Sequence, residues 1–411
     1  MGGAKSLWME QMERGYGSSD HFVCHNCVDE KELKDFIIHM RQDEPCTYCG
    51  YPEAASVEEF TGHILDCLMS EWEHYDSKRD EFARSFSFRE VICFEEPIYS
   101  EQAALIDEIE RIVEIDFWAR TWNYNPEEDD EQEAWHNFTN FVTHRLRFTA
   151  FLSEAEELFR NVNYTRLPAD AGMKYVLKTI GQYGLVKELE SGTAIYRVRF
   201  SDELDNYGTG ADMGTVPRHE AKTANRMSPV GIPMFYGAFF PDVALSEVKR
   251  KESHKFKHVA MFSPSRSLFV ADFTELPSLP SIFSEDRSFR PTVFFLKRFA
   301  EEISKPLKDD DLDHLEYLPS QIVTEYLKLM CKHKDSPIDG IIYRSAQTTD
   351  GKCIVLFVEN EQCLCHPPYP DEENLTTFSA KIGIQNEGVK LRPRLHLILG
   401  KYSASALASP A

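Results

Sequence analysis

Two Cys-x-x-Cys pairs near the N-terminus constrain the fold of this 411-residue chain more than any other feature. The first pair is Cys24 and Cys27, the second is Cys46 and Cys49, and eighteen residues lie between them. Paired cysteines at this spacing are typical of a zinc site in which four thiolates surround one ion. Four thiolates leave no open coordination position, so such a zinc ion is structural rather than catalytic. The alternative interpretation is two redox pairs or four buried thiols.

The charge of the chain excludes a broad nucleic-acid-binding surface. The sequence has 45 Lys and Arg against 68 Asp and Glu, which gives a formal net charge of −23. Nucleic-acid backbones are bound by clustered cationic side chains, so we do not expect general nucleic-acid binding. Hydrophobic residues make up 42% of the chain, which is enough for a packed core. No apolar run approaches the roughly 18 residues needed to span a bilayer, so we expect a cytoplasmic protein without a membrane partner.

The segment after the cysteine pairs has the periodicity of helices. Ser56 and Glu59 have the spacing of a capping box, which predicts that a helix begins there. Apolar residues then recur at steps of three or four in three stretches. These stretches are Phe60–Tyr75, Glu101–Arg120 and Trp135–Leu146. We therefore predict a cysteine-containing region at residues 1–53 and an all-helical domain at residues 54–188.

The pattern changes near Gly181 to strands that alternate with helices. Ala194–Phe200 alternates β-branched and aromatic residues as a strand does. Similar strands are predicted at 232–238, 258–262, 268–273, 339–343 and 353–358, and helices at 242–250, 291–303 and 318–331. Mixed elements of this kind predict an α/β domain over residues 189–400, followed by a flexible tail at 401–411. The whole chain is thus expected to belong to the α+β class.

The most informative stretch is 225–238, where an arginine in a turn rich in Pro and Gly precedes a strand with an aromatic residue. A helix with a carboxylate follows, another arginine stands upstream on a strand, and a serine stands downstream. This order resembles the RES domain family, which is named for its Arg, Glu and Ser, and the resemblance spans roughly residues 192–360. The matching residues are Arg197, Glu247 and Ser345, with Arg226 as the second arginine and Tyr236 as the aromatic residue.

The N-terminal half resembles the HEPN-like domain that precedes some RES domains. The resemblance rests on the cysteine pairs, on Leu33-x-x-Phe36-Ile37, and on helices that end in the run 144–148. HEPN ribonucleases use an arginine followed four to six residues later by a histidine on one helix. No such pair occurs within residues 101–150, so RNA cleavage by this half is not expected.

RES proteins are toxin-like enzymes that consume NAD, and their fold resembles that of ADP-ribosyltransferases. The resemblance therefore implies NAD as substrate and attack on its nicotinamide–ribose bond. Nicotinamide leaves as a neutral molecule, so positive charge builds on the ribose, where a fixed carboxylate such as Glu247 stabilises it. Arg197 and Arg226 are candidates for binding the pyrophosphate. Tyr236 is suited to contact nicotinamide, and Ser345 to bind phosphate or to orient Glu247.

Three functions remain open, because each of these side chains, taken singly, also fits a structural role in a surface pair, loop, turn or core. The first is an NAD glycohydrolase or phosphorylase that uses water or phosphate as acceptor. The second is an ADP-ribosyltransferase with a macromolecular acceptor. The third is a non-catalytic scaffold protein.

The resemblance also bears on partners. It implies a toxin–antitoxin or antiphage defence setting, with an antitoxin or the helical half as inhibitor. The sequence leaves the oligomeric state open, with a homodimer as one option.

Overall fold

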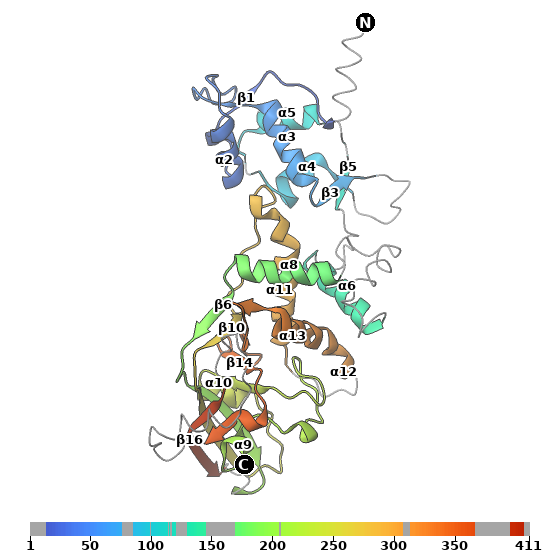
Figure 1. Cartoon of the computed structure of the whole chain (residues 1–411). Helices are drawn as coiled ribbons and strands as arrows, with labels where there is room; N and C mark the ends of the chain where they lie inside the picture. The colour runs from blue at the N-terminus through green and yellow to red at the C-terminus, as the bar shows by residue number, and fades with distance from the viewer. Residues whose placement is uncertain are drawn as a thin grey trace, which may run out of the picture. The chain divides into compact units, whose positions relative to one another are not determined.

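The chain divides into two compact units in the computed structural model (Figure 1). Unit 1 consists of residues 1–133 and 278–291, and unit 2 consists of residues 134–277 and 292–411. Unit 2 therefore contains all the residues on which the RES resemblance rests. The structure describes residues 14–75, 85–98, 100–113, 115, 117–120, 130–144, 169–204, 207–306, 313–365 and 395–406.

Unit 1 combines helices with short strands around one apolar core. Its helices are α2 (Lys31–Met40), α3 (Val57–Leu68), α4 (Phe88–Glu90) and α5 (Ala103–Ile112). Strands β1 (Phe22–Val23) and β2 (Ala55–Ser56) pair antiparallel, and β3 (Trp72–His74), β4 (Phe86–Ser87) and β5 (Phe117–Arg120) form a sheet in the order β3-β5-β4. The largest fully buried side chains of this unit are Phe60, Trp72 and Trp118.

The small sheet is a feature that helical periodicity did not predict. Helix α3 begins directly after Ser56, as expected, although the Ser56 side chain makes no capping hydrogen bond. The helix ends at Leu68, and Trp72 instead pairs across β5 with Arg120, whose guanidinium lies 4.5 Å from the Trp72 ring. The predicted helix over 101–120 likewise ends at Ile112, before β5. Cross-strand burial of large aromatic residues therefore decides the structure here.

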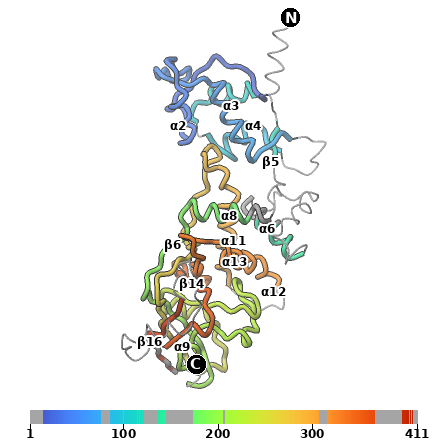
Figure 2. Tube along the Cα trace, in the orientation of Figure 1, coloured from blue at the N-terminus to red at the C-terminus, as the bar shows by residue number. Residues whose placement is uncertain are grey.

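Segment 278–291 comes from the later part of the chain but packs within unit 1, and Figure 2 shows its path as a loop that turns back on itself. Its Arg290 donates to Glu71 Oε1 at 2.7 Å and to Glu96 Oε1 at 2.9 Å. Arg120 lies 3.7 Å from Glu71 and 3.5 Å from Glu96. Two arginines and two glutamates thus form a buried ionic cluster, in which removal of one charge leaves its partners uncompensated.

We expect Arg290→Ala to lower the free energy of unfolding by about 3–5 kcal/mol, because Glu71 and Glu96 would lose a buried partner. Denaturant unfolding of the full chain measures this. Arg41→Ala is the matched control, since Arg41 pairs with Glu53 on the surface, and should change stability by less than about 1 kcal/mol. Equal unfolding midpoints for Arg290→Ala and the wild type would contradict a stabilising cluster.

Unit 2 is built on a sheet of nine strands within the described residues, in the order β15-β16-β9-β7-β8-β14-β13-β10-β6. The pairs β10–β13 and β15–β16 are parallel, and the other neighbours are antiparallel. The strands are β6 (Val186–Leu189), β7 (Ile195–Ser201), β8 (Phe235–Ala238), β9 (Phe256–Pro264), β10 (Leu268–Asp272), β13 (Gly340–Arg344), β14 (Lys352–Leu356), β15 (Cys363–Cys365) and β16 (Leu397–Ala406).

The helices of unit 2 gather beside this sheet (Figure 1). They are α6 (Asp130–His144), α8 (Ala169–Gln182), α9 (Gly210–Met213), α10 (Pro241–Ser246), α11 (Arg290–Ile303), α12 (Asp313–Glu316) and α13 (Leu318–Met330), and a short hairpin is formed by β11 (Lys332–His333) and β12 (Ser336–Pro337). Helices α8 and α11 share one apolar cluster with the sheet, so they belong to this unit rather than to the helical half in which α8 was predicted. In the part of the chain that the structure describes, no helix has the length and apolar character needed to cross a bilayer.

Candidate functional site

The two faces of the unit 2 sheet belong to different apolar clusters. Residues alternate between the faces along each strand. On β7, Val198 packs in one cluster and Ile195 in the other. The first cluster also holds Tyr343, and the second holds Phe235. Arg197 has the same parity on β7 as Ile195, so it lies on the second face.

The carboxylate of Glu247 is held by the segment that follows β13. Glu247 comes directly after α10, and its Oε1 accepts hydrogen bonds from Ser345 Oγ and from the backbone N–H of Ala346 at 3.1 Å. Ser345 Oγ itself accepts the backbone N–H groups of Gln347 at 3.1 Å and Thr348 at 3.2 Å. Two elements 98 residues apart in sequence therefore fix this carboxylate. Among the described residues, the two hydrogen bonds donated to the Glu247 carboxylate both end on Oε1, so Oε2 is able to face a substrate.

Tyr343 is a buried residue on which three of the candidate residues, Tyr236, Glu247 and Arg197, act electrostatically. It is buried on β13, directly across from Cys353 on β14. Burial raises the pKa of the Tyr343 hydroxyl well above its usual value; Cys353, Tyr236 and Glu247 raise it further, whereas Arg197 lowers it. Tyr343 is not among the residues that the family order singled out. The spacing could have identified it, because Tyr343 lies two residues before Ser345 and alternate residues of a strand share a face.

Tyr236 joins the 225–234 loop to the sheet. Its hydroxyl lies 3.0 Å from Ser228 Oγ, and burial raises the pKa of Tyr236 to about 12. The hydroxyl is therefore neutral at physiological pH and acts as a hydrogen-bonding group. The side chain lies on the same sheet face as Val355, its partner on β14, which belongs to the first cluster.

Arg197 occupies the point where two neighbouring strands separate. Strand β7 pairs with β8 only through Tyr196 and Ala238. Beyond that pair, Arg197 Nη1 donates to the backbone carbonyl of Tyr236 at 2.8 Å, and the guanidinium lies 5.0 Å from the Phe235 ring. Burial lowers the pKa of Arg197 to about 9. The side chain therefore takes the place of a ladder hydrogen bond and brings a positive charge into the split between β7 and β8.

Arg226 does not join this group. Its guanidinium donates to the backbone carbonyls of Lys305 at 2.8 Å and Pro306 at 2.6 Å, and it lies 4.8 Å from the Tyr317 ring. The side chain is buried, with 5% exposed. The backbone carbonyl of Arg226 also accepts from Ser320 Oγ at 2.5 Å. A role in pyrophosphate binding stays a prediction for Arg226, and it would require exchange of these bonds.

The four predicted cysteine ligands converge in unit 1. The Sγ–Sγ distances are 3.3 Å for Cys24–Cys49, 3.7 Å for Cys27–Cys46 and 3.8 Å for Cys24–Cys27, and all four sulfurs lie within 4.8 Å of one another. A tetrahedral ion with Zn–S bonds of about 2.3 Å separates its sulfurs by about 3.8 Å. The sulfur positions therefore fit a four-thiolate metal site.

Local structure explains why the two knuckles meet. Pairing of β1 with β2 places the segments that flank the knuckles side by side. Gly50 has a φ of +76°, which a tight knuckle requires and only glycine adopts readily. Ser100 Oγ donates to the carbonyl of Cys27 at 2.7 Å. Burial raises the pKa of Cys24 to about 11, so a cation is needed to hold the Cys24 sulfur as a thiolate at neutral pH.

Sequence comparison with protein families matches two parts of the chain. Residues 194–376 match the RES domain, which includes all five candidate residues of unit 2. Residues 39–156 match HEPN/RES N-terminal domain 1, which includes Cys46 and Cys49 but begins after the first cysteine pair. No curated protein and no solved structure matches the chain. Residues 194–376 are therefore similar to the RES domain, which marks a toxin-like, NAD-related enzyme family, and residues 39–156 are similar to HEPN/RES N-terminal domain 1.

Proposed function

We propose that this protein cleaves the nicotinamide–ribose bond of NAD, with water or phosphate as acceptor. The observation that carries the proposal is the Glu247 carboxylate, fixed on one oxygen by Ser345 and by a backbone N–H. The RES family acts on NAD, which supports the choice of substrate. The four cysteines of unit 1 bind zinc in this proposal, and the ion supports the fold of that unit rather than the chemistry.

The proposed mechanism depends on a carboxylate that is oriented before the substrate binds. Nicotinamide leaves NAD as a neutral molecule, so its departure needs no proton donor. Positive charge develops on the ribose carbon, and Glu247 stabilises that charge through the oxygen that the Ser345 contact leaves open. Because Ser345 and the Ala346 N–H already hold the carboxylate, little reorganisation accompanies the reaction.

Arg197 supplies the positive charge for the phosphate groups in this proposal. Its guanidinium makes one hydrogen bond to a backbone carbonyl and is otherwise stacked over Phe235. A half-buried guanidinium with few partners favours an anion, and its planar fork suits the oxygens of a pyrophosphate. The acidic chain, with its net charge of −23, needs such a local site to attract a negatively charged dinucleotide.

Product analysis tests the proposed reaction. Purified full-length protein is incubated with NAD in ¹⁸O-labelled water, with and without phosphate, and the products are identified by mass spectrometry. Free ADP-ribose indicates water as acceptor, and ADP-ribose 1″-phosphate indicates phosphate. ADP-ribose attached to the protein or to an added macromolecule would instead assign the transferase alternative. NAD that remains intact in all these conditions would refute the proposal.

We expect Ser345→Ala to lower kcat by about 10- to 100-fold, because a hydrogen bond to a charged group contributes about 1.5–3 kcal/mol. Ser345 acts here as a positioning residue through Glu247, so KM for NAD should change much less than kcat. Ser246→Ala is the matched control, since Ser246 neighbours Glu247 but donates to the carbonyl of Val243. Wild-type kcat in Ser345→Ala, or an equal loss in the control, would contradict this role.

A further inference from the structure

A second arginine lies beside Arg197 on the same face of β7. Arg199 follows Arg197 by two positions, so both side chains leave the strand in the same direction. Arg199 Nη2 donates to the carbonyl of Gly214 at 2.7 Å, and its guanidinium lies 5.5 Å from the Tyr207 ring. Its Nε is buried and has no hydrogen-bond partner among the described residues. This orphaned donor is the first sign that a ligand belongs here.

The surroundings of the two arginines contain little negative charge. The groups that act most on Arg197 are Arg199, one cysteine and two tyrosines, and none of them is a carboxylate. The carboxylate that acts on Arg199 is that of Asp212. Its Oδ2 already accepts from Thr209 Oγ1 at 2.7 Å, Thr209 N at 2.8 Å and Gly208 N at 3.2 Å. Within the described ranges, neither arginine forms an ion pair.

Two adjacent, half-buried like charges are unfavourable unless an anion joins them. Burial lowers the pKa of both Arg197 and Arg199, yet a guanidinium stays protonated at neutral pH. Each side chain therefore loses hydration and is repelled by its neighbour. A phosphoryl group would accept hydrogen bonds from the remaining N–H groups, and would offset both the loss of hydration and the repulsion between the two guanidinium groups. Arg226 lacks these features, because its guanidinium is held by two backbone carbonyls and an aromatic ring.

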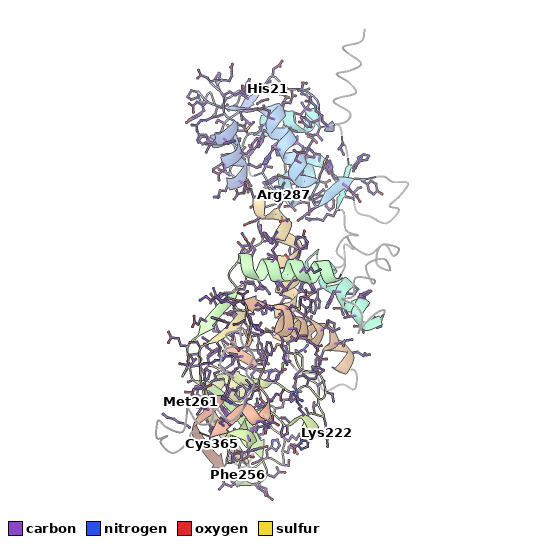
Figure 3. The ribbon with its side chains drawn as sticks, viewed as in Figure 1. His21, Lys222, Phe256, Met261, Arg287 and Cys365 are labelled. Atoms are coloured by element: carbon purple, nitrogen blue, oxygen red, sulfur yellow. The ribbon has the colours of Figure 1, made fainter. Side chains whose placement is uncertain are left out.

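We propose that Arg197 and Arg199 together form a subsite for a phosphoryl oxyanion, in which Arg199 is the second arginine that binds the pyrophosphate of the dinucleotide. The choice of ligand rests on the proposed function. The subsite lies between β7 and the α9 segment, where Gly214 faces Arg199. Strand β15 borders it through Cys363, whose thiol acts on both arginines. The strand ends at Cys365, which is labelled in Figure 3 and accepts the N–H of Gly210 at 3.1 Å. A free phosphate ion offers the same oxygens, so the test separates the two sources.

Arg199→Gln and Arg199→Lys in the full-length protein test the subsite. Loss of charge-assisted bonds to the pyrophosphate should raise KM for NAD by about 10- to 100-fold in the Gln variant. The Lys variant keeps the charge without the planar fork and should lie between the Gln variant and the wild type. Arg218→Gln is the matched control, because Arg218 is exposed and pairs with Glu359, and it should keep the wild-type KM.

Three further measurements identify the ligand and separate the subsite from the proposed NAD cleavage. Calorimetry with ADP-ribose should show weaker binding to Arg199→Gln whether or not the protein releases nicotinamide, which separates this proposal from the proposed function. Nicotinamide riboside, which lacks the pyrophosphate, should bind equally to the wild-type protein and to Arg199→Gln. The dependence of turnover on inorganic phosphate should be unchanged, since an altered dependence would instead assign the subsite to free phosphate. Unchanged KM and ADP-ribose affinity in folded Arg199→Gln, or in Arg199→Lys if the Gln variant unfolds, would overturn the subsite.

Discussion

Glu247→Gln should reduce the turnover of NAD by on the order of 100–1000-fold, the usual effect of removing one electrostatic contact to a developing charge. The amide keeps the size of the carboxylate and can still accept from Ser345 and the Ala346 N–H. It has no negative charge to offer the ribose, so the loss should fall on kcat rather than on affinity. Nicotinamide release over a range of NAD concentrations separates the two parameters.

The control for this experiment is Glu252→Gln. Glu252 is an exposed carboxylate in the same unit, five residues further along the chain, and its loss changes the net charge by the same amount. The turnover of the Glu252→Gln variant should stay within about twofold of the wild type, because exposed charges separated by more than a Debye length of about 8–10 Å are largely screened. Wild-type turnover in Glu247→Gln would exclude Glu247 from the chemistry.

Cys46→Ser should release the metal and unfold unit 1. The sulfur of Cys46 lies 3.7 Å from that of Cys27 and completes the group of four. Structural zinc contributes about 10–16 kcal/mol of apparent binding free energy, which is as large as the stability of a typical domain, about 5–15 kcal/mol. The wild-type protein should carry about one zinc per chain, and the variant much less. Elemental analysis and circular dichroism measure the two effects.

Cys93→Ser provides the matched control for the metal site. Cys93 is a half-buried thiol in the same unit and lies outside the cluster of four. The substitution should leave the zinc content unchanged and have a small effect on stability. A wild-type protein that contains no metal, and that keeps its unfolding temperature after treatment with a chelator, would refute the zinc site.

The cysteine site was predictable from sequence because its geometry is local. Two residues separate the cysteines of each pair, so each knuckle brings two sulfurs together without help from the rest of the fold. The glycine after Cys49 also has the backbone conformation that this motif requires. Only the approach of the two knuckles depends on distant residues, through the β1–β2 pair.

The helical periodicity was less informative, because burial by a sheet can satisfy the same apolar residues. Trp72 continues the spacing of α3, yet it lies in β3 and packs against Arg120. Likewise, the sequence gives no sign that segment 278–291 packs within unit 1, since Arg290 depends on partners some 200 positions earlier, with separations of 219 and 194 residues. Long-range contacts of this kind leave no periodic trace.

The candidate site illustrates the same limit. The sequence order singled out Arg226. The direction of its side chain, however, is set by backbone carbonyls 79 and 80 residues downstream, which no local pattern encodes. The family order did not single out Arg199. Its significance emerges only from the split between β7 and β8, and from an Nε that the fold leaves without a partner. By contrast, the contact between Glu247 and Ser345 brings together two residues that the family order had paired.

The most direct measurement of the central claim is the amount of nicotinamide released from NAD per molecule of full-length protein. The account predicts many nicotinamide molecules per chain from the wild type, with a rate that falls by on the order of 100–1000-fold in Glu247→Gln and stays normal in Glu252→Gln. Zinc content and circular dichroism of the same samples establish that each protein is folded. Release that never exceeds the buffer control in folded, zinc-containing wild-type protein would contradict NAD cleavage by this chain.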